Sequence, residues 1–393
     1  MLQFSECTQY FVPSAIRNKL FDQPDMISFS AGKPEESSFP FAMIQSSIER
    51  VLANDKVRAF QYSDTEGFSS FRAQICALAS HTKTKASPDD ITLTSGSQQG
   101  IYFSAKIFLN PGDVVLCENP SYVGALNVFH SFQAKCVGIP LDADGMNLQA
   151  LEKALCEIPD VKMIYTIPDF QNPTGVTMSV EKRKKLAELA ARYEIPVVED
   201  NPYGELRYNG EAYPSIKSFD EKGFVIYLGT FSKIFCPGLR LGYVIAREDI
   251  RAKIILAKQM SDLQCSSFNE LIAEEFLQQV DWNDHIARVR EIYGARNDLM
   301  DRCMKEYFPA SVHYQKPQGG FFYWLDLPQK GPTSDELLLC AAKEEKVAFL
   351  SGTSFYANQD QPHHIRLSFS NVPYERIEEG LKRLGKLLNR YYA

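Results

Sequence analysis

The sequence predicts an α/β fold: a large domain built on a mostly parallel sheet flanked by helices, with a smaller α+β domain. Two observations predict it. Between residues 91 and 200, short apolar runs that suit strands alternate with helical runs at a spacing of about 30 residues, as in repeated strand–helix units. After residue 280 this alternation gives way to long helices and a few separate strands.

Composition limits the class of protein. The chain has 393 residues, of which 45% are hydrophobic and 23% charged, as in ordinary globular proteins of one large and one small domain. The net charge of −7, without a long basic run, argues against a nucleic-acid partner. No apolar run approaches the roughly 20 residues of a membrane span. We see no signal peptide, and the nine scattered cysteines predict a cytoplasmic protein with no metal site.

The spacing of apolar residues predicts the elements in order. Within residues 26–34 we expect a short extended segment that ends at Gly32. It is followed by a helix at 42–53 and another at 68–80. Strands are expected at 91–94, 114–118, 134–139, 163–166 and 196–200. Between and around them we expect a helix that follows the turn at 95–100 and ends at 109, and helices at 122–132, 148–158 and 180–193. Beyond them we expect strands at 225–228, 241–245, 319–327, 347–350 and 364–369, and helices at 282–308, 334–345 and 374–388. The predicted domains are an N-terminal arm at 1–45 that joins the small domain, a large domain at 46–280 and a small domain at 281–393.

The loop between the strands at 225–228 and 241–245 carries the most suggestive chemistry. Gly229, Pro237 and Gly238 exclude a regular helix there, so the loop must have a specific shape. Burial beside two strands should lower the pKa of Lys233, and a neutral lysine amine is what Schiff-base chemistry requires. Arg240 could bind a phosphate through its guanidinium fork. Taken alone, the same pattern equally fits a surface lysine and arginine on an ordinary loop.

A second loop predicts an anion site. The run Ser95–Gly100 follows a strand and opens a helix, so the backbone amides of Ser97 and Gln98 are free to bind an anion. The run lacks the lysine of a nucleotide P-loop, and the chain has no Gly-x-Gly-x-x-Gly fingerprint, which disfavours ATP and NAD. A simple capping turn is the alternative.

Polar residues also follow other strands. Asp200 ends a buried strand, where a carboxylate needs a cationic partner such as a protonated pyridine nitrogen or a structural arginine. Asn172 lies in a turn just past another strand, and Tyr122 could stack on a flat ring. In parallel sheets ligands bind at the carboxyl ends of strands, so these residues are expected to gather there. Each one alone also fits a turn or core position.

Five motifs in order carry a resemblance to a known family. They are Gly96-Ser-Gln-Gln-Gly100, Asn172-Pro-Thr-Gly175, Glu199-Asp-Asn-Pro-Tyr203, Ser232-Lys233 with Pro237-Gly-Leu-Arg-Leu-Gly242, and Ile365-Arg-Leu-Ser-Phe369. Together, over almost the whole chain, they resemble the class I/II, fold-type I aminotransferases, which depend on pyridoxal 5′-phosphate (PLP). The residues within these motifs are most similar to those of the subgroup that acts on 2-aminoadipate, kynurenine, and aromatic or branched-chain amino acids.

The resemblance implies a role for each candidate residue around PLP. Lys233 would form the Schiff base, Asp200 would bond the pyridinium nitrogen, and Asn172 and Tyr203 would contact the phenolic oxygen. Tyr122 would stack on the ring. The phosphate would be held by Ser97, Gln98, Thr230 and Arg240. The catalytic set implied in this way is Lys233, Asp200 and Tyr203.

The resemblance further implies a homodimer with shared sites and a substrate clamp. Tyr62 would reach the phosphate of the neighbouring subunit. Arg366 would bind the substrate α-carboxylate near the backbone of Gly32 and beside Asn172, although a surface salt bridge at a strand end is the simpler interpretation of this arginine alone.

The implied activity is a ping-pong transamination, with 2-oxoglutarate as the expected acceptor. A PLP-dependent C–S lyase on the same scaffold is one alternative. The other is a non-enzymatic regulator with an aminotransferase-like domain, which the short stretch before Ile27 and the acidic balance disfavour. Because no residue is identified for a distal carboxylate, aspartate-only specificity is not expected. Phe4, Tyr10 and Phe11 could line a pocket for apolar side chains or could serve in packing.

Overall fold

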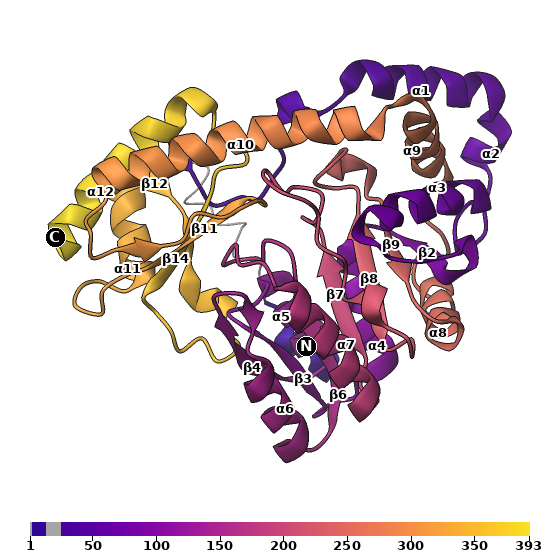
Figure 1. Cartoon of the computed structure of the whole chain (residues 1–393), viewed down its shortest axis with the longest axis horizontal. Helices are drawn as coiled ribbons and strands as arrows, with labels where there is room; N and C mark the ends of the chain where they lie inside the picture. Colours follow the sequence, from indigo (N-terminus) through magenta and orange to yellow (C-terminus); the bar gives the residue numbers. More distant parts are fainter. Residues whose placement is uncertain (1, 13–24) are drawn as a thin grey trace.

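Eight strands form the main sheet of the computed structural model, which describes residues 2–12 and 25–393 (Figure 1). The strands lie in the order β2-β9-β8-β7-β6-β3-β4-β5. Their bounds are Ile91–Thr94 (β2), Val114–Asn119 (β3), Lys135–Asp142 (β4), Gly145–Met146 (β5), Val161–Thr166 (β6), Val197–Asn201 (β7), Val225–Thr230 (β8) and Gly242–Ile245 (β9).

The sheet is mostly parallel, so the α/β prediction is confirmed. Strands β8, β7, β6, β3 and β4 run in one direction, whereas β9 is antiparallel to both of its neighbours, β8 and β2. Strand β5 is antiparallel to β4. Because β9 reverses direction between β2 and β8, those two are parallel to each other. The carboxyl ends of β2, β3, β6, β7 and β8 therefore meet at one edge of the sheet.

The strand before the lysine loop is longer than predicted. Gly229 and Thr230 are the last two residues of β8, and the next strand begins at Gly242. The prediction that Gly229 shapes the loop is therefore wrong. Its role is close packing between strands, because a Cβ atom at Gly229 would lie 2.1 Å from Cζ of Tyr243 on β9.

Helices cover both faces of the sheet because successive strand residues point to opposite sides. In β3, Val115 and Cys117 pack against one set of helices, whereas Val114 and Leu116 pack against the other. The first set is α4 (Ser97–Phe108), α5 (Val123–Ser131) and α8 (Glu248–Gln259). The second is α6 (Leu148–Glu157) and α7 (Val180–Tyr193), and on the same face α3 (Ser69–Ala79) and α9 (Ser267–Gln279) pack against β2, β8 and β9. Helices α1 (Phe41–Asn54) and α2 (Lys56–Phe60) pack on α9.

A four-stranded antiparallel sheet forms the core of the second part of the chain. Its order is β10 (His313–Tyr314), β11 (Phe322–Asp326), β14 (His364–Ser368) and β13 (Leu350–Ser351). It packs with α10 (Trp282–Tyr307), α11 (Ser334–Cys340) and α12 (Ile377–Tyr392). In Figure 1, α10 runs from the neighbourhood of α1 and α9 to that of α12. The remaining turns are the 3₁₀ helices η1 (Glu6–Tyr10), η3 (Glu36–Ser38), η4 (Ser80–Thr82), η5 (Pro88–Asp90), η6 (Lys217–Phe219), η7 (Pro237–Leu239), η9 (Gly352–Phe355) and η10 (Tyr374–Arg376), and the π-helical turn η8 (Ala341–Glu345).

The segment at 347–350 is not the single strand that the sequence predicts. Val347–Ala348 (β12) pairs in parallel with Ile27–Ser28 (β1), and Leu350–Ser351 (β13) pairs with β14. Phe349 lies between the two and is fully buried. The helix expected at 334–345 likewise divides into α11 and η8.

Strand β1 ties the N-terminal segment to this second core. The Phe29 amide donates to the Ala348 carbonyl at 2.7 Å, and the Phe29 carbonyl accepts from the Ser368 amide at 2.7 Å. The predicted boundary at 280/281 coincides with Asp281, whose side chain caps α10, whereas the one at 45/46 falls inside α1. Both remain predictions, and residues 13–24 of the predicted arm lie outside the described residues.

None of the helices in the described ranges combines the length and apolar character needed to cross a bilayer. Within those same ranges, no group of three or more His, Cys, Asp or Glu side chains converges as metal ligands would.

Candidate active site

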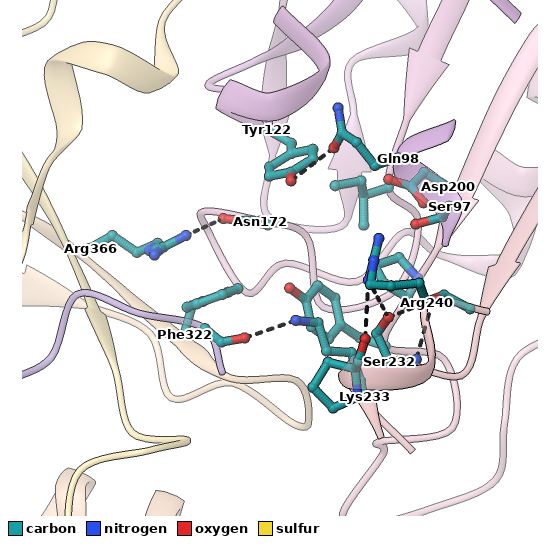
Figure 2. A pocket seen from close by; sticks show the side chains of 16 residues that line it. Ser97, Gln98, Tyr122, Asn172, Asp200, Ser232, Lys233, Arg240, Phe322 and Arg366 are labelled. Carbon is teal, nitrogen blue, oxygen red and sulfur yellow. Dashed lines mark hydrogen bonds between the residues drawn. The ribbon is translucent and has the colours of Figure 1, made fainter. Parts of the chain in front are cut away.

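A pocket of about 200 Å³ opens at the carboxyl edge of the large sheet, facing the small domain (Figure 2). It is lined by Gly32, Ser97, Gln98, Tyr122, Ile167, Asn172, Asp200, Pro202, Tyr203, Thr230, Ser232, Lys233, Pro237, Arg240, Phe322 and Arg366. Every residue that the resemblance assigns to the site is in this set except Tyr62, which lies outside the pocket and is 78% exposed. Side chains from loops far apart in the sequence therefore converge on one small volume.

Lys233 carries an amine suited to nucleophilic attack. It lies three residues past the end of β8, and its Nζ donates to the carbonyl of Gly32 at 2.8 Å, which joins the large domain to the N-terminal segment. Burial lowers the pKa of Lys233 to about 8, and the positive charges of Arg366 and Arg240 act in the same direction. Because the neutral amine is the nucleophilic form, the lowered pKa suits Lys233 to attack a carbonyl group.

Asp200 presents one free carboxylate oxygen to the pocket. The hydroxyl of Tyr165, on the neighbouring strand β6, donates to Oδ2 at 2.8 Å, whereas the buried Oδ1 has no hydrogen-bond partner. Burial raises the pKa of Asp200 to about 6, against the Tyr165 bond, the nearby Ser97 hydroxyl and the charge of Lys233. A buried oxygen without a partner is costly, so this arrangement fits a ligand that donates an N–H, such as a protonated pyridine.

The N-terminus of α4 forms the anion-binding end of the pocket. Ser97 and Gln98 are the first two residues of α4, and their amides have no acceptor within the helix. The preceding Gly96 has φ of +80°, and a Cβ atom there would lie 2.4 Å from Nη2 of Arg240. Glycine at this position therefore lets the guanidinium pack over the turn, where Nη2 donates to the Ser95 carbonyl at 3.0 Å.

Two hydroxyls complete this end of the pocket. The Thr230 hydroxyl, at the end of β8, donates to Ser232 Oγ at 3.0 Å, and Arg240 Nη1 donates to the same Ser232 oxygen at 3.4 Å. Hydroxyls, free amides and a guanidinium are the groups that proteins use to hold a phosphate.

Tyr122 and Tyr203 supply neutral aromatic rings to the pocket. The Tyr122 hydroxyl donates to Gln98 Oε1 at 3.1 Å, which fixes the ring at the N-terminus of α5. Burial raises the pKa of Tyr122 to about 12. Burial also raises the pKa of Tyr203, whose ring meets Phe321 and Phe322 edge to face. Both rings therefore stay uncharged near neutral pH.

Arg366 approaches the pocket from the small domain, on β14 opposite Trp324 of β11. Its Nη1 donates to Asn172 Oδ1 at 2.8 Å and its Nη2 to the Ser30 carbonyl at 2.5 Å, whereas its buried Nε has no partner. Burial lowers the pKa of Arg366 to about 10, so the side chain remains a cation. A buried cation with a free N–H fits a carboxylate ligand.

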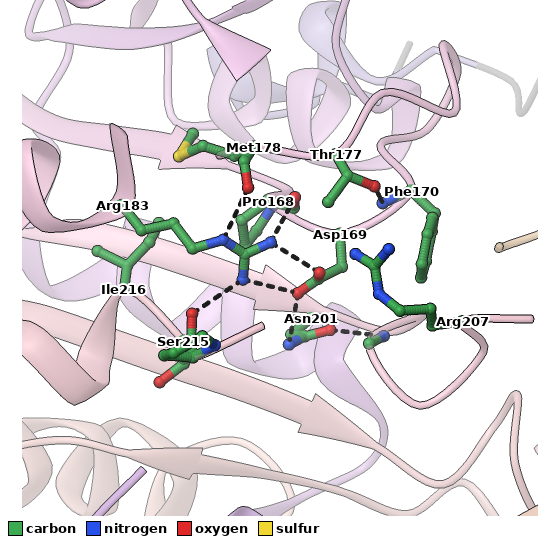
Figure 3. Close-up of polar contacts among 12 residues, drawn as sticks. Pro168, Asp169, Phe170, Thr177, Met178, Arg183, Asn201, Arg207, Ser215 and Ile216 are labelled. Atoms are coloured by element: carbon green, nitrogen blue, oxygen red, sulfur yellow. Dashed lines mark hydrogen bonds and ion pairs between the residues drawn. The ribbon is translucent and has the colours of Figure 1, made fainter. Parts of the chain in front are cut away.

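The loop that carries Asn172 is held by a buried ion pair (Figure 3). Arg183 of α7 binds both carboxylate oxygens of Asp169, at 3.0 and 2.7 Å, and donates to the carbonyls of Pro168 and Met178. Asn201, at the end of β7, donates to the same aspartate at 3.3 Å. The loop that carries Asn172 is thus fixed both to helix α7 and to strand β7, which also contains Asp200.

Some site residues were not singled out from the sequence. Tyr165 looks like any buried strand tyrosine, and only the register of β6 beside β7 brings it to Asp200. Phe322, whose ring lies 4.0 Å from the Arg366 guanidinium carbon, comes from a strand whose position cannot be predicted without the small-domain fold. Conversely, Phe4, Tyr10 and Phe11 do not line the pocket in the single chain and are exposed.

Comparisons with known proteins agree with this arrangement. The family model for class I and II aminotransferases matches residues 24–384. The chain is 41% identical to aromatic-amino-acid aminotransferase 1 of Thermococcus litoralis, over 98% of this chain and 94% of that protein. It is 36% identical to the 2-aminoadipate transaminase of Thermus thermophilus, over 95% and 93%. A crystal structure of Pyrococcus horikoshii kynurenine aminotransferase superposes with a TM-score of 0.94 at 39% identity, covering 98% of this chain and 97% of that one.

Proposed function

Because this chain belongs to the class I and II aminotransferases, enzymes that use PLP, we propose that its pocket catalyses ping-pong transfer of an amino group from an L-amino acid to a 2-oxo acid. The observation that carries the proposal is that one pocket contains both the amine of Lys233 and the free carboxylate oxygen of Asp200. A pyridine aldehyde could react with the Lys233 amine through its aldehyde group and donate the N–H of its protonated ring nitrogen to Asp200 at the opposite end of the ring.

When bound, PLP supplies an aldehyde that forms Schiff bases with amines and a pyridinium ring that withdraws electrons from the substrate α-carbon. Asp200 would accept the ring N–H through Oδ1, which keeps that nitrogen protonated. Ser97, Gln98, Thr230 and Arg240 would hold the phosphate. Asn172 and Tyr203 would contact the phenolic oxygen, and Tyr122 would lie against the ring.

The residues then have distinct tasks in the reaction. Arg366 binds the α-carboxylate and thereby orients the Cα–H bond. Lys233 first provides the amine that holds the cofactor. The Lys233 amine, once free, would act as the general base that takes the proton from the substrate Cα and then as the acid that gives it up again. A pKa near 8 suits both tasks, because the side chain can be neutral as a nucleophile and as a base.

The proposed donors are aromatic, branched apolar or 2-aminoadipate-type amino acids, with 2-oxoglutarate as acceptor. The names of the related enzymes support the aromatic and 2-aminoadipate-type donors. The lining supports its apolar part, since Ile167, Pro202 and Phe322 lie beside the Arg366 cation. Among the described lining residues, the only cations are Lys233, Arg240 and Arg366, so the lining has no further cation that would restrict the donors to aspartate alone.

A panel of amino donors with 2-oxoglutarate tests the proposal. We expect aromatic and branched donors to give the corresponding 2-oxo acids and glutamate. Reaction with aspartate alone among the donors would contradict the proposed substrate range. Release of ammonia and pyruvate from cysteine-type donors without amino-group transfer would favour the C–S lyase alternative. Cofactor binding without any turnover across the panel would favour a regulatory domain.

We also propose a homodimer in which Tyr62 completes the phosphate site of the partner. Its support is an exposed apolar surface: Val57, Phe60, Tyr62 and Met260 are each more than 70% exposed in the single chain. The hydrogen bond from the Ser63 amide to Gln264 Oε1, at 2.6 Å, joins the two segments that carry this surface.

Subunit mixing tests the shared site. Lys233→Ala and Tyr62→Ala homodimers should each be impaired at limiting PLP. Unfolding and refolding them together should restore activity, because a mixed dimer has one site with both residues intact. Failure of the mixture to recover, with dimers present by sedimentation, would contradict the shared site.

A further inference from the structure

The turn that forms the anion-binding end of the pocket is held from behind by three polar side chains. Gln99 lies in the first turn of α4, Lys258 in the last turn of α8, and Asp262 just beyond α8. We call Gln99, Lys258 and Asp262 the phosphate brace. None of the three lines the pocket.

Gln99 uses both ends of its amide in this brace. Its Oε1 accepts from the backbone amide of Ser95 at 2.8 Å, and its Nε2 donates to Asp262 Oδ2 at 2.8 Å. The Ser95 hydroxyl donates to the same carboxylate oxygen at 3.3 Å. Gln99 and Asp262 therefore hold the turn leading into α4 at the Ser95 amide and hydroxyl, whereas Arg240 holds it at the Ser95 carbonyl.

Lys258 neutralises the carboxylate in the brace. Its side chain is completely buried, and Nζ donates to both oxygens of Asp262 at 3.0 Å and to Gln99 Oε1 at 3.3 Å. An unpaired Asp262, one hydrogen bond away from the anion-binding turn, would repel an anion there. Removing only the lysine would leave that carboxylate uncompensated.

We propose that the phosphate brace positions the Ser95–Gln98 turn and keeps Asp262 neutralised, so that the pocket binds the phosphate of its cofactor. The inference rests on the proposed function, because it assumes that the phosphate binds at the N-terminus of α4. The three brace residues are positioning residues, since they act through the turn and do not touch the cofactor.

The test compares two ligands that differ only in the phosphate. Pyridoxamine 5′-phosphate and pyridoxamine are titrated into the apo-dimer by calorimetry, so neither forms a Schiff base with Lys233. We expect Gln99→Leu and Lys258→Met to weaken binding of the phosphorylated ligand by about tenfold or more, and that of pyridoxamine by less than about twofold. Lys253→Met, the same substitution at an exposed position of α8, should change neither constant.

A double variant separates charge from shape. If Asp262 repels the phosphate once Lys258 is gone, then Lys258→Met with Asp262→Asn should bind the phosphorylated ligand more tightly than Lys258→Met alone. Equal weakening of both ligands by the single variants, or an unchanged preference for the phosphorylated ligand, would overturn the brace. A wild-type protein with no preference for the phosphorylated ligand would instead overturn the assigned phosphate site, and the brace with it.

Discussion

Replacing Arg366 with lysine tests the substrate clamp most directly, because it keeps the charge and removes the planar fork. In the structure the guanidinium has bonds to Asn172 and Ser30 and a free Nε, and it is 2% exposed. Lysine cannot keep these bonds and grip both oxygens of a carboxylate at once.

The magnitude follows from the bonds lost. A hydrogen bond to a charged group contributes about 1.5–3 kcal/mol, and the fork offers two of them to a carboxylate. Since lysine retains the Coulombic attraction, we expect a loss of about 3 kcal/mol, which is roughly 150-fold in kcat/KM for an amino-acid donor. Arg376, a half-buried arginine of η10 that does not line the pocket, supplies the control Arg376→Lys, which should stay near wild type.

Inhibition constants isolate the carboxylate from the rest of catalysis. For Arg366→Lys, 3-phenylpropanoate should bind much more weakly, whereas the uncharged 3-phenylpropanamide should be little affected. The visible absorbance of the bound cofactor should persist, because Arg366 is not assigned to it. A kcat/KM within about fivefold of wild type, or equal weakening of both inhibitors, would refute the assignment of Arg366 to the carboxylate.

Three further predictions follow from other parts of the structure. Lys233→Ala should abolish both turnover and the visible absorbance of the lysine-bound cofactor; a variant that turned over near the wild-type rate would eliminate Lys233 as the catalytic amine. Burial raises the pKa of Glu118 from 4.5 to about 7, so its contribution to stability is complete below about pH 4.5 and is lost as the pH rises through about 7. In urea titrations of the apo-protein across that pH range, Glu118→Gln should reduce this fall in stability by up to about 3 kcal/mol. The exposed control Glu157→Gln should leave the dependence of stability on pH unchanged, and a Glu118→Gln profile parallel to that of wild type would argue against the raised pKa. Arg183→Met should destabilise the protein by about 3–5 kcal/mol because it leaves Asp169 buried without its partner. The neighbouring surface variant Lys184→Met should cost less than about 0.5 kcal/mol. Similar urea midpoints for the two variants would contradict the role of the buried pair.

Sequence patterns were enough to predict part of the set of residues that face the pocket. Lys233, Asp200 and Asn172 each follow a recognisable buried strand, and parallel strands place such positions at one edge. Arg366 needed the resemblance to known enzymes, because an arginine in an isolated strand has no signal that distinguishes a clamp from a salt bridge.

The residues behind the pocket were not predictable, because their roles depend on register and tertiary packing. Tyr165 meets Asp200 only because β6 and β7 are neighbours, although 35 residues separate them in the chain. Asp262 and Gln99 are 163 residues apart and meet only once α8 has packed beside α4. The interruption at Phe349 depends on two different sheets competing for one apolar run, which the local pattern cannot reveal.

Strand β1 has a consequence for how the polypeptide is made. Its partners, β12 and the end of β14, follow it by more than 300 residues, so Ile27 and Phe29 must remain unpaired until those elements have been synthesised. Gly32, whose carbonyl accepts a hydrogen bond from the Lys233 amine, lies in the segment that continues from this strand. Lys233 therefore acquires its final surroundings only after β12 has been synthesised, and a nascent chain halted before β12 would contain the lysine loop without its closed pocket.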